Sequence, residues 1–158
     1  MMPDSNIFWT NMANKLRILV DLNIAVDVVQ GRQPFYTQSA LVMDAVANQE
    51  VEGLLAAHSI TNLFYIVSRL ANRQTAVTTI ADLLNSFRVA TVDDQVIRTA
   101  QALSWKDFED AVQMAAALNA NLDYIVTRNP QDFETQPVPV LTPAAFLTLL
   151  PPPPTPSP

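Results

Sequence analysis

The sequence of 158 residues contains no cysteine and a single histidine, His58. Disulfides, cysteine-zinc sites and thiol nucleophiles are therefore excluded, and one histidine cannot by itself form a histidine-rich metal site. Any chemistry must use oxygen ligands or hydroxyl groups. His58 lies at the end of an apolar stretch, where a structural role is the commoner one. We therefore assign it no function from the sequence.

Glycine is also scarce, and Gly31 and Gly53 are the only two. The sequence has no GxGxxG or GxxxxGK[ST] loop, which argues against a nucleotide-dependent fold. The net charge of −6 argues against a broad basic surface for nucleic acid, so any nucleic-acid contact must be local. No apolar run approaches the roughly 18 residues of a membrane-spanning helix, and residues 1–16 lack signal-peptide features. We expect a cytoplasmic protein with no membrane partner.

The composition, with 49% hydrophobic and 15% charged residues, is typical of a well-packed globular protein. The length fits one domain, which we place at residues 16–150, after an N-terminal extension at 1–15. Residues 151–158 form a proline-rich tail, expected to be extended and disordered outside the core. A solvated end is favoured there over a ligand for an aromatic groove.

Short, branched apolar runs alternate with helical patterns along the predicted domain. The runs that predict strands lie at residues 16–20, 51–56, 88–92, 123–127 and 138–141. Two consecutive helices are predicted between the second and third strands, the first capped by Ser59 or Thr61, and a final helix opens at Thr142 and runs to Leu150. Strands that alternate with helices predict a parallel sheet covered on both faces.

Acidic and polar side chains follow the predicted strands, where ligands collect in parallel α/β sheets. Asp21 directly ends the first strand, and a polar turn at 127–133 follows a later one. Asp107 and Asp110 lie about 60° apart on one edge of an apolar helix face, from which Glu109 is expected to point away. Helix capping, the helix dipole and loop polarity are ordinary explanations for each feature taken alone.

The combination of these acids is more informative than any one of them. Carboxylates that converge from separate strand ends repel one another when ionised, and a divalent cation is the usual remedy. Oxygen ligands without histidine or cysteine favour Mg²⁺ or Mn²⁺. The sequence therefore indicates a possible magnesium or manganese site at one edge of the sheet.

At these residues the chain resembles the PIN-domain family, the metal-dependent ribonuclease fold that includes the VapC toxins of bacterial toxin–antitoxin pairs. Over residues 16–150, three segments are similar to the family's D-[ST]-N, central D-A helix and T-R-[DN]-x-x-D-F motifs. They are I-L-V-D-L-N at 18–23, D-F-E-D-A at 107–111 and T-R-N-P-Q-D-F at 127–133, with 138–143 as the closing edge. The resemblance implies a three-layer α/β/α sandwich with a central, mainly parallel sheet of four to five strands.

The resemblance also implies roles for individual residues. Asp21 and Asp110 would be the principal metal ligands, and Asn23 and Thr127 would orient a water or a phosphate. The implied catalytic acids are Asp21, Asp107 and Asp110, the metal ligands are these three with Asn129, and the supporting residues are Asn23, Asn62, Thr127, Arg128 and Asp132. Arg128 or Arg32 could contact backbone phosphates, and the ordinary alternative for each is a surface cation.

Three positions depart from the family pattern. Leu22 lacks the usual hydroxyl, Asn62 stands where the family has an acid after its second strand, and Asn129 often corresponds to aspartate. Because ligand charge helps to set the affinity for a hard cation, these changes would weaken metal binding.

Our first hypothesis is a Mg²⁺- or Mn²⁺-dependent endoribonuclease that hydrolyses RNA phosphodiester bonds, resembling the toxin of a toxin–antitoxin pair. A homodimer and an antitoxin partner are implied with it. The alternative is a catalytically weakened PIN module that binds RNA or a protein partner, which the three departures favour. A phosphoacceptor receiver domain is less favoured, because it would need a lysine on a late strand and no lysine follows Lys106.

Overall fold

The computed structural model describes residues 15–152 and Pro156. The predicted N-terminal extension therefore lies outside the described residues except for Lys15. Of the predicted tail, only Pro151, Pro152 and Pro156 are described. Within the described part of the chain, no helix is both long and apolar enough to cross a membrane.

Five strands form one sheet in the order β3-β2-β1-β4-β5. Each neighbouring pair is parallel, so the carboxyl ends of all five strands meet at the same edge. The strands are β1 (Arg17–Val20), β2 (Glu52–Ala56), β3 (Arg88–Ala90), β4 (Tyr124–Val126) and β5 (Val140–Leu141). The predicted parallel sheet of four to five strands is confirmed.

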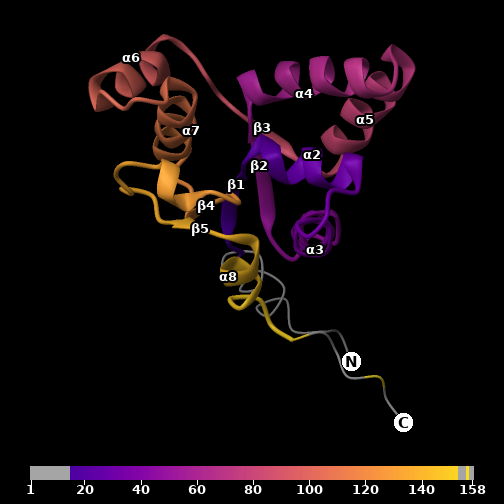
Figure 1. Ribbon diagram of the computed structural model, residues 1–158. Coiled ribbons are helices and arrows are strands. Elements are labelled where there is room, and N and C mark those ends of the chain that lie inside the picture. The colour runs from indigo at the N-terminus through magenta and orange to yellow at the C-terminus, as the bar shows by residue number, and fades with distance from the viewer. Residues whose placement is uncertain (1–14, 153–155, 157–158) are drawn as a thin grey trace, which may run out of the picture.

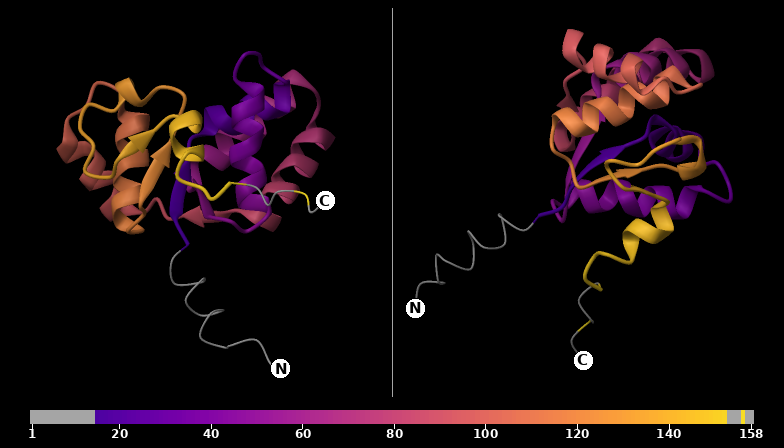
Figure 2. Two further views of the ribbon diagram at one scale, coloured as in Figure 1. Left: turned by 90° about the horizontal axis from the view of Figure 1, so that it is seen from below. Right: turned by 90° about the vertical axis from the view of Figure 1, so that its left-hand side faces the viewer.

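Helices cover both faces of this sheet (Figure 1). They are α2 (Leu22–Gln30), α3 (Tyr36–Ala47), α4 (Ala57–Leu70), α5 (Arg73–Ser86), α6 (Asp94–Leu103), α7 (Phe108–Asn119) and α8 (Pro143–Leu147), with a short 3-10 helix η1 (Pro130–Asp132). Figures 1 and 2 show α6 and α7 on one side of the strands and α2, α3 and α5 on the other. The predicted three-layer α/β/α architecture is confirmed.

Side chains of the central strand alternate between two apolar cores, as the pleat of a strand requires. Leu19 packs into the core beneath α6 and α7. Its neighbours Ile18 and Val20 pack into the opposite core with α2, α3 and α8. All three are fully buried, so β1 must be apolar on both faces, which explains its unbroken hydrophobic run.

The element boundaries differ from the predictions in several places. Two helices, α2 and α3, connect β1 to β2. The prediction that Ser59 or Thr61 caps the next helix is wrong, because β2 passes directly into α4 with Ala56 at the cap. Ser59 is buried in the first turn, and the Thr61 hydroxyl donates back to the carbonyl of His58 at 2.9 Å. The last helix stops at Leu147, before the predicted Leu150.

Gly53, in the middle of β2, allows α3 and the end of α5 to approach the sheet closely. A Cβ atom there would lie 2.6 Å from Val46 Cγ2 and 2.9 Å from Phe87 Cε1. Gly31, at the end of α2, has a φ of +59° and nothing within 4 Å of a Cβ position. The two glycines are thus required for different reasons, packing at Gly53 and backbone conformation at Gly31.

We predict that Gly53→Ala lowers the free energy of unfolding by about 1–3 kcal/mol through overpacking. Gly31→Ala is the matched control, since it adds the same methyl group in open space and costs about 1 kcal/mol from the left-handed backbone alone. Urea unfolding of both variants measures the difference. A Gly53→Ala protein at least as stable as Gly31→Ala would contradict the close approach.

Candidate metal centre

Asp21 lies at the carboxyl edge of the sheet, between the ends of β1 and β4. Its backbone N–H donates to the carbonyl of Val126 at 2.9 Å, which extends the pairing of the two strands by one step. Its side chain caps α2 by accepting from the N–H of Asn23 at 3.3 Å. The other carboxylate oxygen accepts a 2.8 Å hydrogen bond from the Thr127 hydroxyl. Asp21 is therefore both a helix cap and an oriented acid at the strand edge.

Thr127 connects polar residues of two of the three sequence motifs, those at 18–23 and 127–133. Its side chain is completely buried, and its hydroxyl accepts from Asn23 Nδ2 at 3.4 Å and from the backbone N–H of Asn129 at 3.3 Å. The Asn23 Oδ1 atom is buried and has no hydrogen-bond partner among the described residues. The structure thus brings Asp21, Asn23 and Thr127 together, with one oxygen left unpaired.

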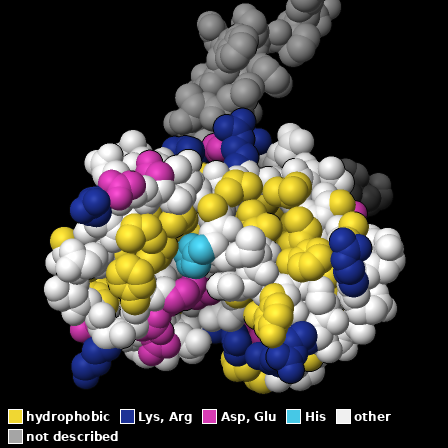
Figure 3. All heavy atoms as spheres, turned by 90° about the horizontal axis from the view of Figure 1, so that it is seen from above, with side chains coloured by type: hydrophobic (Ala, Val, Ile, Leu, Met, Phe, Trp, Pro, Cys, Tyr) yellow, Lys and Arg dark blue, Asp and Glu magenta, His cyan; other side chains and the backbone are white. Residues whose placement is uncertain are grey.

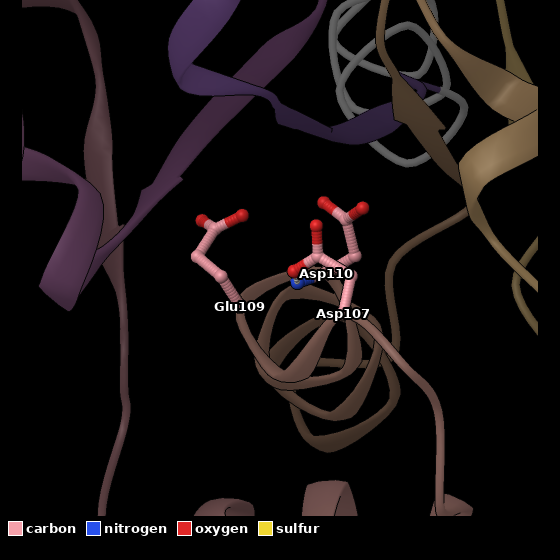
Figure 4. A group of neighbouring side chains, drawn as sticks. All are labelled: Asp107, Glu109 and Asp110. Carbon is pink, nitrogen blue, oxygen red and sulfur yellow. Dashed lines mark hydrogen bonds between the residues drawn. The ribbon is translucent and has the colours of Figure 1, made fainter.

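Three further acids come from the start of α7. Asp107 is the N-cap of this helix and accepts from the N–H of Asp110 at 3.1 Å. Asp107, Glu109 and Asp110 each offer a carboxylate oxygen, and these three atoms lie within 4.8 Å of one another. Figure 4 shows the carboxylates projecting to the same side of the helix start. Asp110 is buried, whereas Asp107 is exposed.

The prediction that Glu109 points away from the other two acids is wrong. Asp107 has an extended backbone at the cap, so the helical angle assumed between it and its neighbours does not apply. Glu109 shares a face with the fully buried Gln113, whose Nε2 donates to both of its carboxylate oxygens at 3.2 and 3.3 Å. His58 Nε2, from α4, lies 3.0 Å from Glu109 Oε1. Neither contact partner was assigned to the site from the sequence.

Burial and mutual repulsion perturb these acids. Burial raises the pKa of Asp21, although the hydrogen bond from Thr127 opposes the shift. Burial, together with the charges of Asp107, Glu109 and Asp21, raises the pKa of Asp110 to about 8. Burial alone would raise the pKa of Glu109, but the hydrogen bond and charge of His58 and the amide of Gln113 outweigh it and lower the pKa. The site therefore concentrates negative charge and retains a proton on Asp110.

A hollow of about 540 Å³ opens beside these acids. Asp21, Asn23, Asn62 and Glu109 line it. Leu22 adds apolar surface to the lining, and the arginines Arg32 and Arg128 add positive charge. Figure 3 shows acidic side chains next to the histidine on this face of the molecule. The predicted site residues that are not among the lining residues are Asp107, Asp110, Thr127, Asn129 and Asp132. Asp132 is exposed on η1, and Asn129 joins the site through its backbone N–H.

The sequence left open whether Arg128 is an ordinary surface cation, and the structure shows that it is not. Its side chain is only 17% exposed, and its Nε lies 2.9 Å from Oδ2 of Asp27, which is fully buried. The guanidinium carbon lies 4.5 Å from the centre of the Phe35 ring. Ser39 also donates to Asp27, at 3.2 Å. The orientation of Arg128 at the edge of the hollow is therefore fixed by α2 and α3.

The donor set fits a hard divalent cation. Several carboxylate oxygens and an unpaired buried amide oxygen converge, and no lysine or arginine forms an ion pair with these acids in the described part of the chain. Such an oxygen-rich set matches the ligand preference of Mg²⁺ and Mn²⁺. Burial is the largest cause of the raised pKa of Asp110, and the charges of Asp107, Glu109 and Asp21 raise it further.

The protonation of Asp110 yields a prediction for the metal-free protein. Because the folded-state pKa is raised from 3.8 to about 8, the folded protein holds this proton more tightly than the unfolded chain does. Stability should therefore fall as the pH rises between these two values. Asp110→Asn cannot ionise, so at pH 8 in chelator it should be more stable than wild type by on the order of 1–3 kcal/mol.

Urea unfolding across this pH range measures the effect. The difference between Asp110→Asn and wild type should shrink towards the acid end of the range. Asp94→Asn, an exposed acid in the first turn of α6, is the matched control and should show no such growth with pH. If the stability of Asp110→Asn depends on pH in the same way as that of wild type, the pKa of Asp110 is not raised in the folded protein.

Comparison with solved structures shows the same fold in several toxin–antitoxin proteins. A toxin–antitoxin complex from Klebsiella pneumoniae is 21% identical, with 80% of this chain and 97% of that chain covered and a TM-score of 0.61. VapBC-1 from nontypeable Haemophilus influenzae is 14% identical, with 82% and 99% covered and a TM-score of 0.64. VapC20 of Mycobacterium tuberculosis, described as a Sarcin-Ricin loop cleaving toxin, is 14% identical, with 68% and 86% covered and a TM-score of 0.56.

The sequence comparisons agree with this fold. A search of curated proteins found no match. The family model described as PIN domain matches residues 17–131, which include the strand β1, the start of α7 and the turn after β4. Since this match spans well over half of the chain and contains the acidic edge described above, the protein belongs to the PIN-domain family.

Proposed function

We propose that the protein is a Mg²⁺- or Mn²⁺-dependent endoribonuclease that acts as the toxin of a toxin–antitoxin pair. The observation that carries this proposal is the cluster of Asp107, Glu109 and Asp110 at the start of α7, with Asp21 at the end of β1 near enough to raise the pKa of Asp110. Asp21 and Glu109 line one open hollow. Acids that bind no cation would be expensive to bring together at a partly buried edge.

The residues of the site suit the hydrolysis of a phosphodiester. A bound divalent cation would polarise the phosphate and lower the pKa of an attacking water. Asp21, Asp107 and Asp110 would hold that cation, with Asn129 as a further predicted ligand. Thr127 and Asn23 fix the carboxylate of Asp21 and can orient a water or a phosphate oxygen.

Family membership and the structural neighbours support the biological part of the proposal. One neighbour is described as a toxin that cleaves the Sarcin-Ricin loop, and another as VapBC from Salmonella typhimurium bound to DNA. By analogy, we propose RNA as the substrate, an antitoxin protein as the partner and a homodimer as the assembly.

The second candidate is a catalytically weakened PIN module that binds RNA or a protein. Asn62 lines the hollow but carries no charge, and Leu22 beside it carries no hydroxyl, which favours this alternative. Glu109 opposes it, because it adds a carboxylate to the same hollow from α7. We therefore prefer the active enzyme.

RNA cleavage by wild type and Asp21→Asn, each with Mg²⁺, Mn²⁺ or chelator, tests the proposal. We expect the substitution to reduce cleavage by at least roughly 100-fold, because it removes a charged metal ligand. Asp123→Asn is the matched control. Asp123 lies at the amino end of β4, on the opposite edge of the sheet, where it accepts from the Arg17 N–H at 2.8 Å, and its loss should leave cleavage unchanged. Cleavage that survives both Asp21→Asn and chelation would remove the proposed mechanism.

The contact between His58 and Glu109 generates a prediction about metal affinity. His58→Ala leaves Glu109 held by Gln113 alone, so Mn²⁺ affinity measured by calorimetry should fall roughly tenfold. His58→Gln keeps a donor and should retain most of the affinity. Thr61→Ala, on the same helix but without a contact to Glu109, is the control. Equal affinities for wild type and His58→Ala would show that His58 does not position this acid.

A further inference from the structure

A second, smaller hollow lies beside the acidic one, and Arg128 is the wall that the two share. Its volume is about 240 Å³. The remaining lining residues come from the start of α3 and of α8, and they are Phe35, Gln38, Ser39, Thr142, Pro143 and Ala144. No residue of the acidic cluster lines it, so its chemistry must differ from that of the proposed metal centre.

Arg128 presents a guanidinium of fixed orientation to both hollows. Its Nε lies at ion-pair distance, 2.9 Å, from Oδ2 of buried Asp27 but without hydrogen-bond geometry, and the guanidinium lies over the Phe35 ring. A guanidinium carries further donors on its two Nη atoms, which suit a phosphate oxygen. Because Asp27 balances the charge of Arg128, the added positive charge at this end comes from Arg32, an exposed residue that lines the acidic hollow.

The smaller hollow has the features of a site for one aromatic base. The Phe35 ring is 40% exposed, and aromatic rings and arginine planes are the groups on which unpaired bases stack. Gln38 is exposed at the same hollow and carries an amide that can both donate to and accept from a base edge. The volume is below the roughly 300 Å³ at which drug-sized pockets begin, so it limits the occupant to a single small ring system.

The two hollows are adjacent along the chain as well as in space. Arg128 directly follows Thr127, whose hydroxyl is 2.8 Å from the Asp21 carboxylate. Arg128 itself lines the acidic hollow together with Asp21 and Glu109, so a phosphate on its guanidinium lies at the edge of that hollow. This spacing favours neighbouring units of one polymer over two independent ligands.

We infer that the Phe35–Arg128 hollow binds the nucleotide next to the scissile phosphate of single-stranded RNA. The base stacks on Phe35 against Gln38, and its phosphate contacts Arg128 and Arg32. The strand must be single at this point, because a base within a duplex cannot leave its stack to enter the hollow without breaking its pair. This inference rests on the proposed ribonuclease function and names the part of the substrate that it recognises.

The inference is tested by binding of a short oligouridylate to the full chain. Fluorescence anisotropy measures the affinity, and a chelator is present to prevent cleavage. Phe35→Leu should weaken binding roughly tenfold, since it removes one stacked base, whereas Phe35→Tyr should stay within about twofold. Tyr36→Leu is the matched control, because Tyr36 is the next residue, is 38% exposed and lines neither hollow. Gln38→Leu, at an exposed position, is a second variant and should weaken binding by about two- to tenfold.

An abasic ribose-phosphate chain of the same length separates recognition of the base from a structural effect. Removal of the bases should weaken binding to wild type more than binding to Phe35→Leu or Gln38→Leu, and thermal unfolding should confirm that each variant is folded. Equal losses for wild type and both variants would overturn the inference, as would unchanged affinity in both variants. If RNA cleavage depends on Asp21 but base removal weakens binding equally in wild type and variants, the subsite is wrong and the nuclease proposal stands. If base removal weakens binding more in wild type but no RNA is cleaved, the nuclease proposal is wrong and the subsite stands.

Discussion

Repulsion between carboxylates at the carboxyl edge of the sheet is the interaction on which the rest of this site depends. Two like charges about 5 Å apart repel by on the order of 3 kcal/mol at the effective dielectric of a protein surface. A hydrogen bond to a carboxylate, such as those from Thr127 and Gln113, contributes about 1.5–3 kcal/mol and so offsets part of one such repulsion. Burial of Asp110 adds a desolvation cost to this repulsion, and the two together raise its pKa to about 8. A proton or a cation must complete the cluster.

The fold offers partial compensation through its helix starts. Asp21 is the N-cap of α2, and Asp107 is the N-cap of α7, so both acids sit at the positive end of a helix dipole. Each such placement is worth roughly 0.3–1 kcal/mol, which offsets part of one pairwise repulsion. The parallel topology is what makes this arrangement possible, because it points the carboxyl ends of β1 and β4 at the same edge. The two proposed metal ligands Asp21 and Asp107 are therefore also helix caps.

The sequence predicted the position of the polar residues that follow a strand better than the position of the acids at the start of a helix. Asp21 and Thr127 directly follow the apolar residues of β1 and β4, so locating them required no assumption about helical angles. Glu109 was misjudged because an ideal helical wheel was applied across Asp107, which the structure shows outside the helix. His58 was passed over because β2 enters α4 without a loop, so nothing in the local pattern signals that its ring reaches across to α7.

Arg128 could not have been placed from local sequence either, since its partners come from two other helices. Asp27 and Phe35 lie about a hundred positions earlier in the chain, and only the pairing of β1 with β4 brings them beside Arg128. A buried ion pair is weak evidence for stability, because desolvation of both charges cancels most of their attraction. The structure keeps this pair at the wall between two open hollows. An oriented guanidinium at that wall is of use to a ligand, and a phosphate chain that crosses from one hollow to the other is the ligand that would meet it.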